Sequence, residues 1–169
     1  MECEKGINAE ITENHIPRWE ELPSIELYKD QIIAYLDEAL KVYVSKDEDG
    51  HILTKTMINN YVKNEVIHPT KKKKYNKEHI ASLFIICLLK QIYSLNDIAD
   101  LIKIATRTTT IENAYNNFCD ELEKAIDNVF EGKSYEILKD TTNENYALRR
   151  VVLSFANKLY VDKVYLKRF

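Results

Sequence analysis

Residues that interrupt helices are scarce in this sequence. It contains only three glycines and three prolines in 169 residues. So few glycines leave no glycine-rich loop of the kind that cradles phosphates. Leu, Ile, Lys, Glu and Ala are abundant instead, and this composition favours a mostly helical protein. The chain is long enough to bury the core of one ordinary domain.

Cysteine and histidine are too scattered to form a reactive site. Cys3, Cys87 and Cys119 are odd in number and far apart, which excludes a disulfide framework and favours a reducing cytosol. Cys87 lies in the apolar run FIICLL and is expected to pack in the core. The four histidines and the carboxylates show no metal-ligand spacing such as HExxH. The sequence therefore predicts no catalytic residue, no metal and no cofactor.

Long apolar runs are also missing. No stretch approaches the roughly 20 apolar residues that span a bilayer, and the acidic start MECEKGINAEITENH is unlike a signal peptide. We therefore expect a cytoplasmic protein that does not bind a membrane, and the lysine, isoleucine, asparagine and tyrosine bias fits a bacterial source. The basic C-terminal stretch LRRVVLSFANKLYVDKVYLKRF is the one candidate for a membrane surface. Asn157 and Asp162 interrupt it, which favours packing in the core.

Positive charge is concentrated in one segment. The chain has a net charge of −3, yet residues 52 to 80 contain seven lysines against two glutamates, or +5, and the remainder carries −8. Four of these lysines are consecutive, Lys71 to Lys74, in the stretch VIHPTKKKKYNKEH. An acidic protein with one basic segment often has a single anionic partner.

Apolar spacing and capping residues predict a series of helices. The first starts after Ser24 and runs to about Tyr43, and a short one over 55–64 is capped by Thr54. Asn76 caps a helix that ends near Gln91 or Tyr93, and Ser94 with Asp97 forms a capping box for the next one. A long amphipathic helix covers 111–130 before Gly132, and a last helix covers about 143–166. Val66-Ile67 and Tyr75 are predicted to be short strands that flank the lysines as a minimal β-ribbon.

The short helix and the lysines together suit duplex DNA. Met57, Ile58, Tyr61 and Val62 can form the buried stripe of the helix, which leaves Lys55, Thr56, Asn59, Asn60 and Lys63 outside. Asn and Lys on such a helix can meet base edges in the major groove, while lysines in a neighbouring loop neutralise phosphates. The alternative is a charged surface helix beside a solvated loop.

The order of these features resembles the winged helix-turn-helix of the MerR group of transcription regulators. Thr54 stands at the opening cap, Val66-Ile67-His68-Pro69 leads into the wing, and Tyr75 closes it. The run LLKQIYSLNDI then resembles the end of one helix and the Ser-Leu start of the next. The sequence differs from that group at Asn59, at Asn60 and at Glu65, which occupies the usual glycine position. Its wing is shorter, and the loop SKDEDGHIL before the short helix is longer.

A second resemblance covers more of the chain. The runs IPRWEELP, LTKTMINNYVK and KKYNKEHIASLFIICLLKQIYSLNDI are similar to a family of short bacterial proteins described as a domain of unknown function. This resemblance extends from about Ile16 to Phe118 and implies no settled activity.

These resemblances imply an all-α fold with a MerR-like winged helix-turn-helix, a small β-ribbon wing and C-terminal helices. We expect residues 1–15 to be disordered, 16–103 to form the winged domain with an N-terminal arm that packs Ile16, Trp19 and Leu22, and 104–169 to form a helical region. The polar stretch ATRTTT is the expected hinge. The helix 111–130 is the candidate for dimerisation, which would let two short helices bind an inverted repeat.

The leading functional hypothesis is a DNA-binding transcription regulator without catalysis, which binds double-stranded DNA as a homodimer. The expected DNA-binding residues are Lys55, Thr56, Asn59, Asn60, Lys63, Lys71, Lys72, Lys73, Lys74 and Tyr75. Tyr75 would anchor the wing and could also reach the DNA backbone. The alternative is a non-catalytic adaptor that binds another protein through the same fold. A small-molecule effector, held among Tyr115, Phe118 and Phe155, would be a variant of the first hypothesis.

Overall fold

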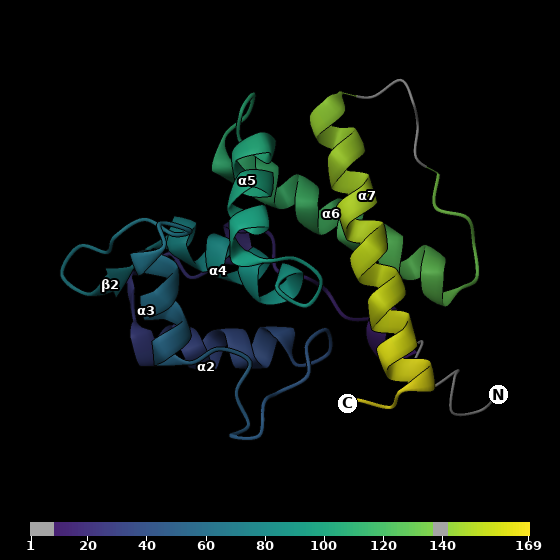
Figure 1. The fold of residues 1–169 in the computed structure, drawn as a ribbon, viewed down its shortest axis with the longest axis horizontal. Helices are drawn as coiled ribbons and strands as arrows, with labels where there is room; N and C mark the ends of the chain where they lie inside the picture. The colour runs from purple at the N-terminus through teal and green to yellow at the C-terminus, as the bar shows by residue number, and fades with distance from the viewer. Residues whose placement is uncertain (1–8, 137–141) are drawn as a thin grey trace. The chain divides into compact units, whose positions relative to one another are not determined.

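The computed structural model describes residues 9–136 and 142–169. It is mostly helical, with one small antiparallel sheet, as the composition predicts (Figure 1). The chain divides into two compact units. The N-terminal unit is Pro17–Lys103, and the C-terminal unit comprises Ile104–Phe169 together with the described residues up to Ile16.

The N-terminal unit is built from short elements around one apolar helix. In chain order they are η1 (Trp19–Glu21), β1 (Leu27–Tyr28), α2 (Lys29–Leu40), α3 (Lys55–Lys63), β2 (Lys74–Tyr75), α4 (Lys77–Leu89) and α5 (Leu95–Ala105), whose last two residues fall in the other unit. Helix α4 has buried residues on every side, from Ile80 to Leu89, so it forms the centre of this unit. Ile32, Leu36 and Leu40 of α2 and Ile58 and Tyr61 of α3 are buried as well.

Three of the capping predictions are confirmed, those at Thr54, Asn76 and Ser94. Thr54 Oγ1 accepts a hydrogen bond from Met57 N at 3.2 Å, and Asn76 Oδ1 accepts one from His79 N at 3.1 Å. Ser94 and Asp97 exchange the two bonds of a capping box, Asp97 N to Ser94 Oγ at 3.2 Å and Ser94 N to Asp97 Oδ2 at 3.3 Å. Short polar side chains therefore set the start of α3, α4 and α5.

The predicted β-ribbon is confirmed only for its strand at Tyr75, which lies in β2. Val66 and Ile67 form no strand; Lys74 and Tyr75 pair instead with Tyr28 and Leu27, which belong to the segment expected to begin the first helix. Helix α2 consequently begins at Lys29 rather than just after Ser24. A two-residue strand has no hydrophobic period, so the residue pattern gave no sign of this pairing.

The C-terminal unit contains α6 (Ile111–Phe130), α7 (Asn143–Tyr160) and the π-helical turn η2 (Val161–Tyr165). Helix α6 packs along α7, and its apolar stripe, including Tyr115, Leu122 and Ile126, is buried within the chain. Gly132 ends α6 with a φ of +68°. The last predicted helix is thus present, but it changes from α to π winding at Val161.

The start of the chain was expected to be disordered. Residues 1–8 lie outside the described residues, whereas Ile11 is 1% exposed and Ile16 N donates to Glu123 Oε1 at 2.7 Å. Of the expected arm, Ile16 and Leu22 are buried and Trp19 is half-buried. In the part of the chain that is described, every helix is too short or too polar to cross a membrane.

Candidate nucleic-acid interface

Helix α3 presents its polar side chains to solvent. The five residues predicted for its outer surface, which we call the polar face of α3, are all exposed: Lys55, Thr56, Asn59, Asn60 and Lys63. Ile58 and Tyr61 hold the opposite side in the core, at 0% and 4% exposed. Asn59 and Asn60 are exposed within the N-terminal unit, so α3 can approach a partner along this face.

The loop that precedes α3 is fixed by a carboxylate of α2. Asp37 Oδ1 accepts a hydrogen bond from Ile52 N at 2.8 Å, and Asp37 Oδ2 lies 3.0 Å from His51 Nδ1. This bond to Asp37 raises the pKa of the exposed His51. Lys90, the C-cap residue of α4, donates from Nζ to the carbonyl of Ile52 at 3.0 Å. These bonds hold the long polar loop SKDEDGHIL in one conformation, and they therefore fix the position at which α3 begins.

The end of α3 forms a Schellman motif around Glu65. Val66 N donates to Tyr61 O at 2.9 Å and Glu65 N donates to Val62 O at 3.1 Å, which is the bond pattern of that motif. Glu65 takes the left-handed conformation, with a φ of +56°, whereas Asn64 stays at −90°. The left-handed position therefore lies one residue after the cap residue Asn64.

The four lysines form a tight reverse turn, which we call the lysine turn (Lys71–Lys74). Lys74 N donates to Lys71 O at 3.1 Å, and Lys72 and Lys73 both have positive φ angles, 52° and 59°. Two such angles are typical of the type I′ turns that close hairpins and usually carry Asn-Gly. Lys71, Lys72 and Lys73 are exposed. Figure 1 shows the loop between α3 and β2 projecting away from the helices of this unit.

Lys74 and Tyr75 differ from the other predicted residues. Lys74 is half-buried, with its Nζ 5.5 Å from the ring centroid of Tyr28. Tyr75 is only 3% exposed and packs edge-on against His79 at 5.6 Å, and burial raises its pKa. The structure therefore places Tyr75 in the core as an anchor of the strand pair, and not on the surface with the exposed lysines.

A short segment joins the lysine turn to α3. Tyr28 pairs with Lys74 in the sheet, and the next residue, Lys29, donates to Asn59 Oδ1 at 2.6 Å. Asp30 then forms an ion pair with Lys55, 2.6 Å from Oδ1 to Nζ. Contacts thus run without a break from the turn through Tyr28 and Lys29 to the polar face of α3. Sequence reasoning missed these residues because their contacts join positions far apart in the chain and have no local pattern.

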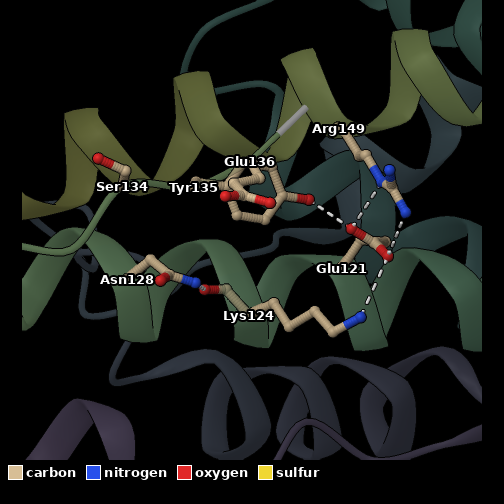
Figure 2. Close-up of a pocket in the computed structure, with 7 residues that line it drawn as sticks. All are labelled: Glu121, Lys124, Asn128, Ser134, Tyr135, Glu136 and Arg149. Atoms are coloured by element: carbon tan, nitrogen blue, oxygen red, sulfur yellow. Dashed lines mark hydrogen bonds and ion pairs between the residues drawn. The ribbon is translucent and has the colours of Figure 1, made fainter. Parts of the chain in front are cut away.

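A second polar cluster lies in the C-terminal unit. A shallow pocket of about 300 Å³ is lined by Glu121, Lys124, Asn128, Ser134, Tyr135, Glu136 and Arg149. Figure 2 shows Tyr135, Arg149 and Lys124 converging on the carboxylate of Glu121. Arg149 Nε lies 3.2 Å from Oε2, Lys124 Nζ lies 3.5 Å from Oε1, and the Tyr135 hydroxyl donates to Oε2.

The electrostatics of this cluster indicate a structural role. Burial acts to raise the pKa of Glu121, but the hydrogen bond from Tyr135 and the charge of Arg149 outweigh it, so the net effect is a lowered pKa. Burial and the Glu121 carboxylate together raise the pKa of Tyr135 well above its ordinary value. The carboxylate is thus charged and already satisfied by its three neighbours. It links α6 to α7 and leaves little capacity for a ligand.

The residues proposed to hold an effector lie in the core of the C-terminal unit. Tyr115, Phe118 and Phe155 are 1%, 4% and 2% exposed and belong to the packed core of the C-terminal unit. The pocket described above is lined by other residues, so an effector site among these three stays a prediction. The buried stripe of α6 likewise packs on α7 of the same chain, so this stripe is not free to pair with a second copy.

Comparison with known proteins gives one family. A family model described as "Domain of unknown function (DUF1836)" matches residues 17–118, which cover the N-terminal unit, residues 104–110 and the first part of α6. No curated protein and no solved structure matches the chain.

Proposed function

The chain belongs to the DUF1836 family, and from its geometry we propose that it is a DNA-binding protein, a bacterial transcription regulator without catalysis. In this proposal the polar face of α3 enters the major groove, and Lys71, Lys72 and Lys73 bind phosphates beside it. Lys74 and Tyr75 hold the turn in place. The proposal treats this arrangement as a MerR-like winged helix-turn-helix in which the wing is reduced to the lysine turn.

One observation carries the proposal. The lysine turn and α3 belong to a single surface, because Tyr28 contacts Lys74 and the adjacent Lys29 contacts Asn59. A recognition helix needs phosphate-binding groups at a fixed distance beside it, since phosphate contacts set the register in which bases are contacted. A solvated lysine loop without this tether would have no defined position relative to α3.

The charge distribution supports the same function. The basic segment 52–80 carries +5 within an acidic chain, and two of its lysines, Lys55 and Lys74, contact Asp30 and Tyr28 on either side of Lys29. Positive charge beside exposed asparagines favours duplex DNA over a polyanion without bases. Asparagine can form hydrogen bonds with base edges, and only a nucleic acid offers them. Two such surfaces in a homodimer would bind an inverted repeat.

Binding to random duplex DNA across a salt series tests the proposal. The parent is expected to bind at low salt and to weaken steeply as salt rises, because bound phosphates release counterions. Replacing Lys71, Lys72 and Lys73 by alanine should reduce the magnitude of the slope of log K against log salt by about 3, or about 1 per phosphate contact. Lys74 is left in place because it packs on Tyr28.

A charge-matched control separates position from net charge. Replacing Lys41, Lys46 and Lys103, which are exposed in the same unit, removes three positive charges away from the lysine turn. We expect that variant to keep the parent slope. Failure of the parent to bind duplex DNA at low salt contradicts the proposal and favours the adaptor, in which the same surface binds an acidic protein.

A further inference from the structure

We propose that Lys29 sets the base specificity of Asn59, so that the two side chains act together as a donor-only pair that selects guanine. This inference rests on the proposed DNA binding by α3 and adds a specificity-determining residue outside that helix. Its basis is the hydrogen bond of 2.6 Å between Lys29 Nζ and Asn59 Oδ1.

The ammonium group fixes how the Asn59 carboxamide is turned. An ammonium can only donate hydrogen bonds, so the atom that faces Lys29 must be the carbonyl oxygen Oδ1 and not the amide nitrogen. The amide nitrogen Nδ2 therefore points away from Lys29. Within the described residues Nδ2 has no protein acceptor, and Asn59 is exposed, so its two N–H groups are available to a partner.

Lys29 is itself held in place by the start of α2. It is the first residue of that helix, and Tyr28 before it is paired with Lys74 in the sheet. Tyr28 N also donates to Gln31 Oε1 at 2.8 Å, which closes the first turn of α2. The backbone of Lys29 is therefore fixed on both sides, and its side chain reaches α3 from a rigid position.

The chemistry of base edges then predicts the preference. A free asparagine binds adenine with both of its groups, because Oδ1 accepts from the N6 amino group while Nδ2 donates to N7. In this protein Oδ1 already accepts from a cation, and the positive ammonium repels a second donor such as an amino group. The groups left to contact a base are the N–H donors of Asn59 and Lys29. These donors match guanine, because its O6 and N7 are both acceptors.

The test is a specificity switch measured on the full-length protein. A preferred duplex is selected from a random pool, and affinities are then measured on duplexes that differ only by G·C or A·T at each position. We expect the parent to favour guanine by about tenfold at one position, in the range of one good bidentate pair. Lys29→Met should free Oδ1 and shift the preference at that position to adenine. Lys29→Arg keeps a cationic donor and should keep guanine.

Two control variants isolate the pair. Lys72→Met removes one positive charge from the lysine turn and should lower affinity for guanine and adenine duplexes equally. In an Asn59→Ala background, Lys29→Met should no longer change the base preference, since the carboxamide that it orients is gone. Neither side chain belongs to the core, since Lys29 is half-buried and Asn59 is exposed. These variants are therefore expected to fold.

The outcomes distinguish this inference from the function on which it rests. A parent that does not bind duplex DNA at low salt overturns both. A parent that binds with salt dependence, but whose guanine preference is the same after Lys29→Met, overturns only the inference. An adenine preference in the parent has the same consequence, because it would require Oδ1 to be free.

Discussion

At the scale of single residues, the end of α3 carries a local conflict. Glu65 has a φ of +56° at the position after the helix cap, where glycine is usual. A residue with a Cβ atom pays about 1 to 2 kcal/mol in this conformation. The bonds of the Schellman motif to Val62 O and Tyr61 O keep Glu65 there in spite of that cost.

Glu65→Gly is expected to stabilise the protein. Glycine adopts the left-handed conformation without steric cost, although its greater freedom in the unfolded chain offsets part of the gain. We expect the free energy of unfolding, measured by urea denaturation, to rise by about 0.5 to 1 kcal/mol. Glu65→Ala is the matched control, since it removes the charge but keeps the Cβ atom. An equal gain from alanine would assign the effect to charge instead of conformation.

At the scale of helices and strands, capped helices could be predicted from the sequence and the strand pair could not. Thr54, Asn76 and Ser94 precede clear apolar periods, and a cap acts within three residues of itself, so local sequence contains the information. The pairing of Tyr28 with Lys74 joins residues far apart in the chain, and neither strand is long enough to alternate. The candidate site divides in the same way, because the polar face of α3 follows from helical spacing whereas Lys29 and Asp30 reach it only through the fold.

The contact between α2 and α3 predicts a variant with stronger DNA binding. Asp30 is exposed and forms an ion pair with Lys55 on the polar face of α3, so it places a negative charge next to the proposed interface. Asp30→Asn should release Lys55 and increase DNA affinity several-fold at low salt, with the gain disappearing at high salt. The exposed Glu38 pairs with Lys41 on the same helix, so Glu38→Gln is the control. A similar gain from Glu38→Gln would indicate a general effect of net charge.

The packing of α6 on α7 depends on the charged state of Glu121. Its folded-state pKa is lowered, so its contribution to stability is fully present above the unfolded value of about 4.3 and is lost as pH falls through the lower folded value. Glu121→Gln should lower the free energy of unfolding by about 2 kcal/mol at neutral pH, because Arg149 and Tyr135 lose a charged partner. The difference between parent and variant should shrink in acid, below about pH 4.

A carboxylate on the surface of the same helix provides the comparison for Glu121. Glu112 is exposed in the first turn of α6, and Glu112→Gln should have an effect of less than about 0.5 kcal/mol. Denaturation curves of both variants over a pH series check the prediction. A difference for Glu121→Gln that does not change between neutral and acid pH would show that packing, and not ionisation, provides the stability.

At the scale of the whole molecule, the division into two compact units predicts two separable unfolding transitions. Each unit has its own buried core, centred on α4 in one and on α6 with α7 in the other. Trp19 is the only tryptophan of the chain and lies in the N-terminal unit, so its fluorescence reports on Pro17–Lys103 alone. Far-ultraviolet circular dichroism reports on the helices of both units.

Two substitutions with opposite expected effects on stability test this prediction. One replaces a glycine and the other introduces one. Gly132 ends α6 at a φ of +68° with nothing within 4 Å of an added Cβ atom, so Gly132→Ala should destabilise the C-terminal unit by about 1 kcal/mol through backbone strain alone. The Trp19 transition should stay where it is in Gly132→Ala and should move to higher urea in Glu65→Gly, because only Glu65 lies in the unit that Trp19 reports on. If both variants moved the fluorescence and dichroism transitions together, the chain would unfold as one cooperative unit. Substitutions in α6 would then also change DNA binding, because they would change the stability of the N-terminal unit.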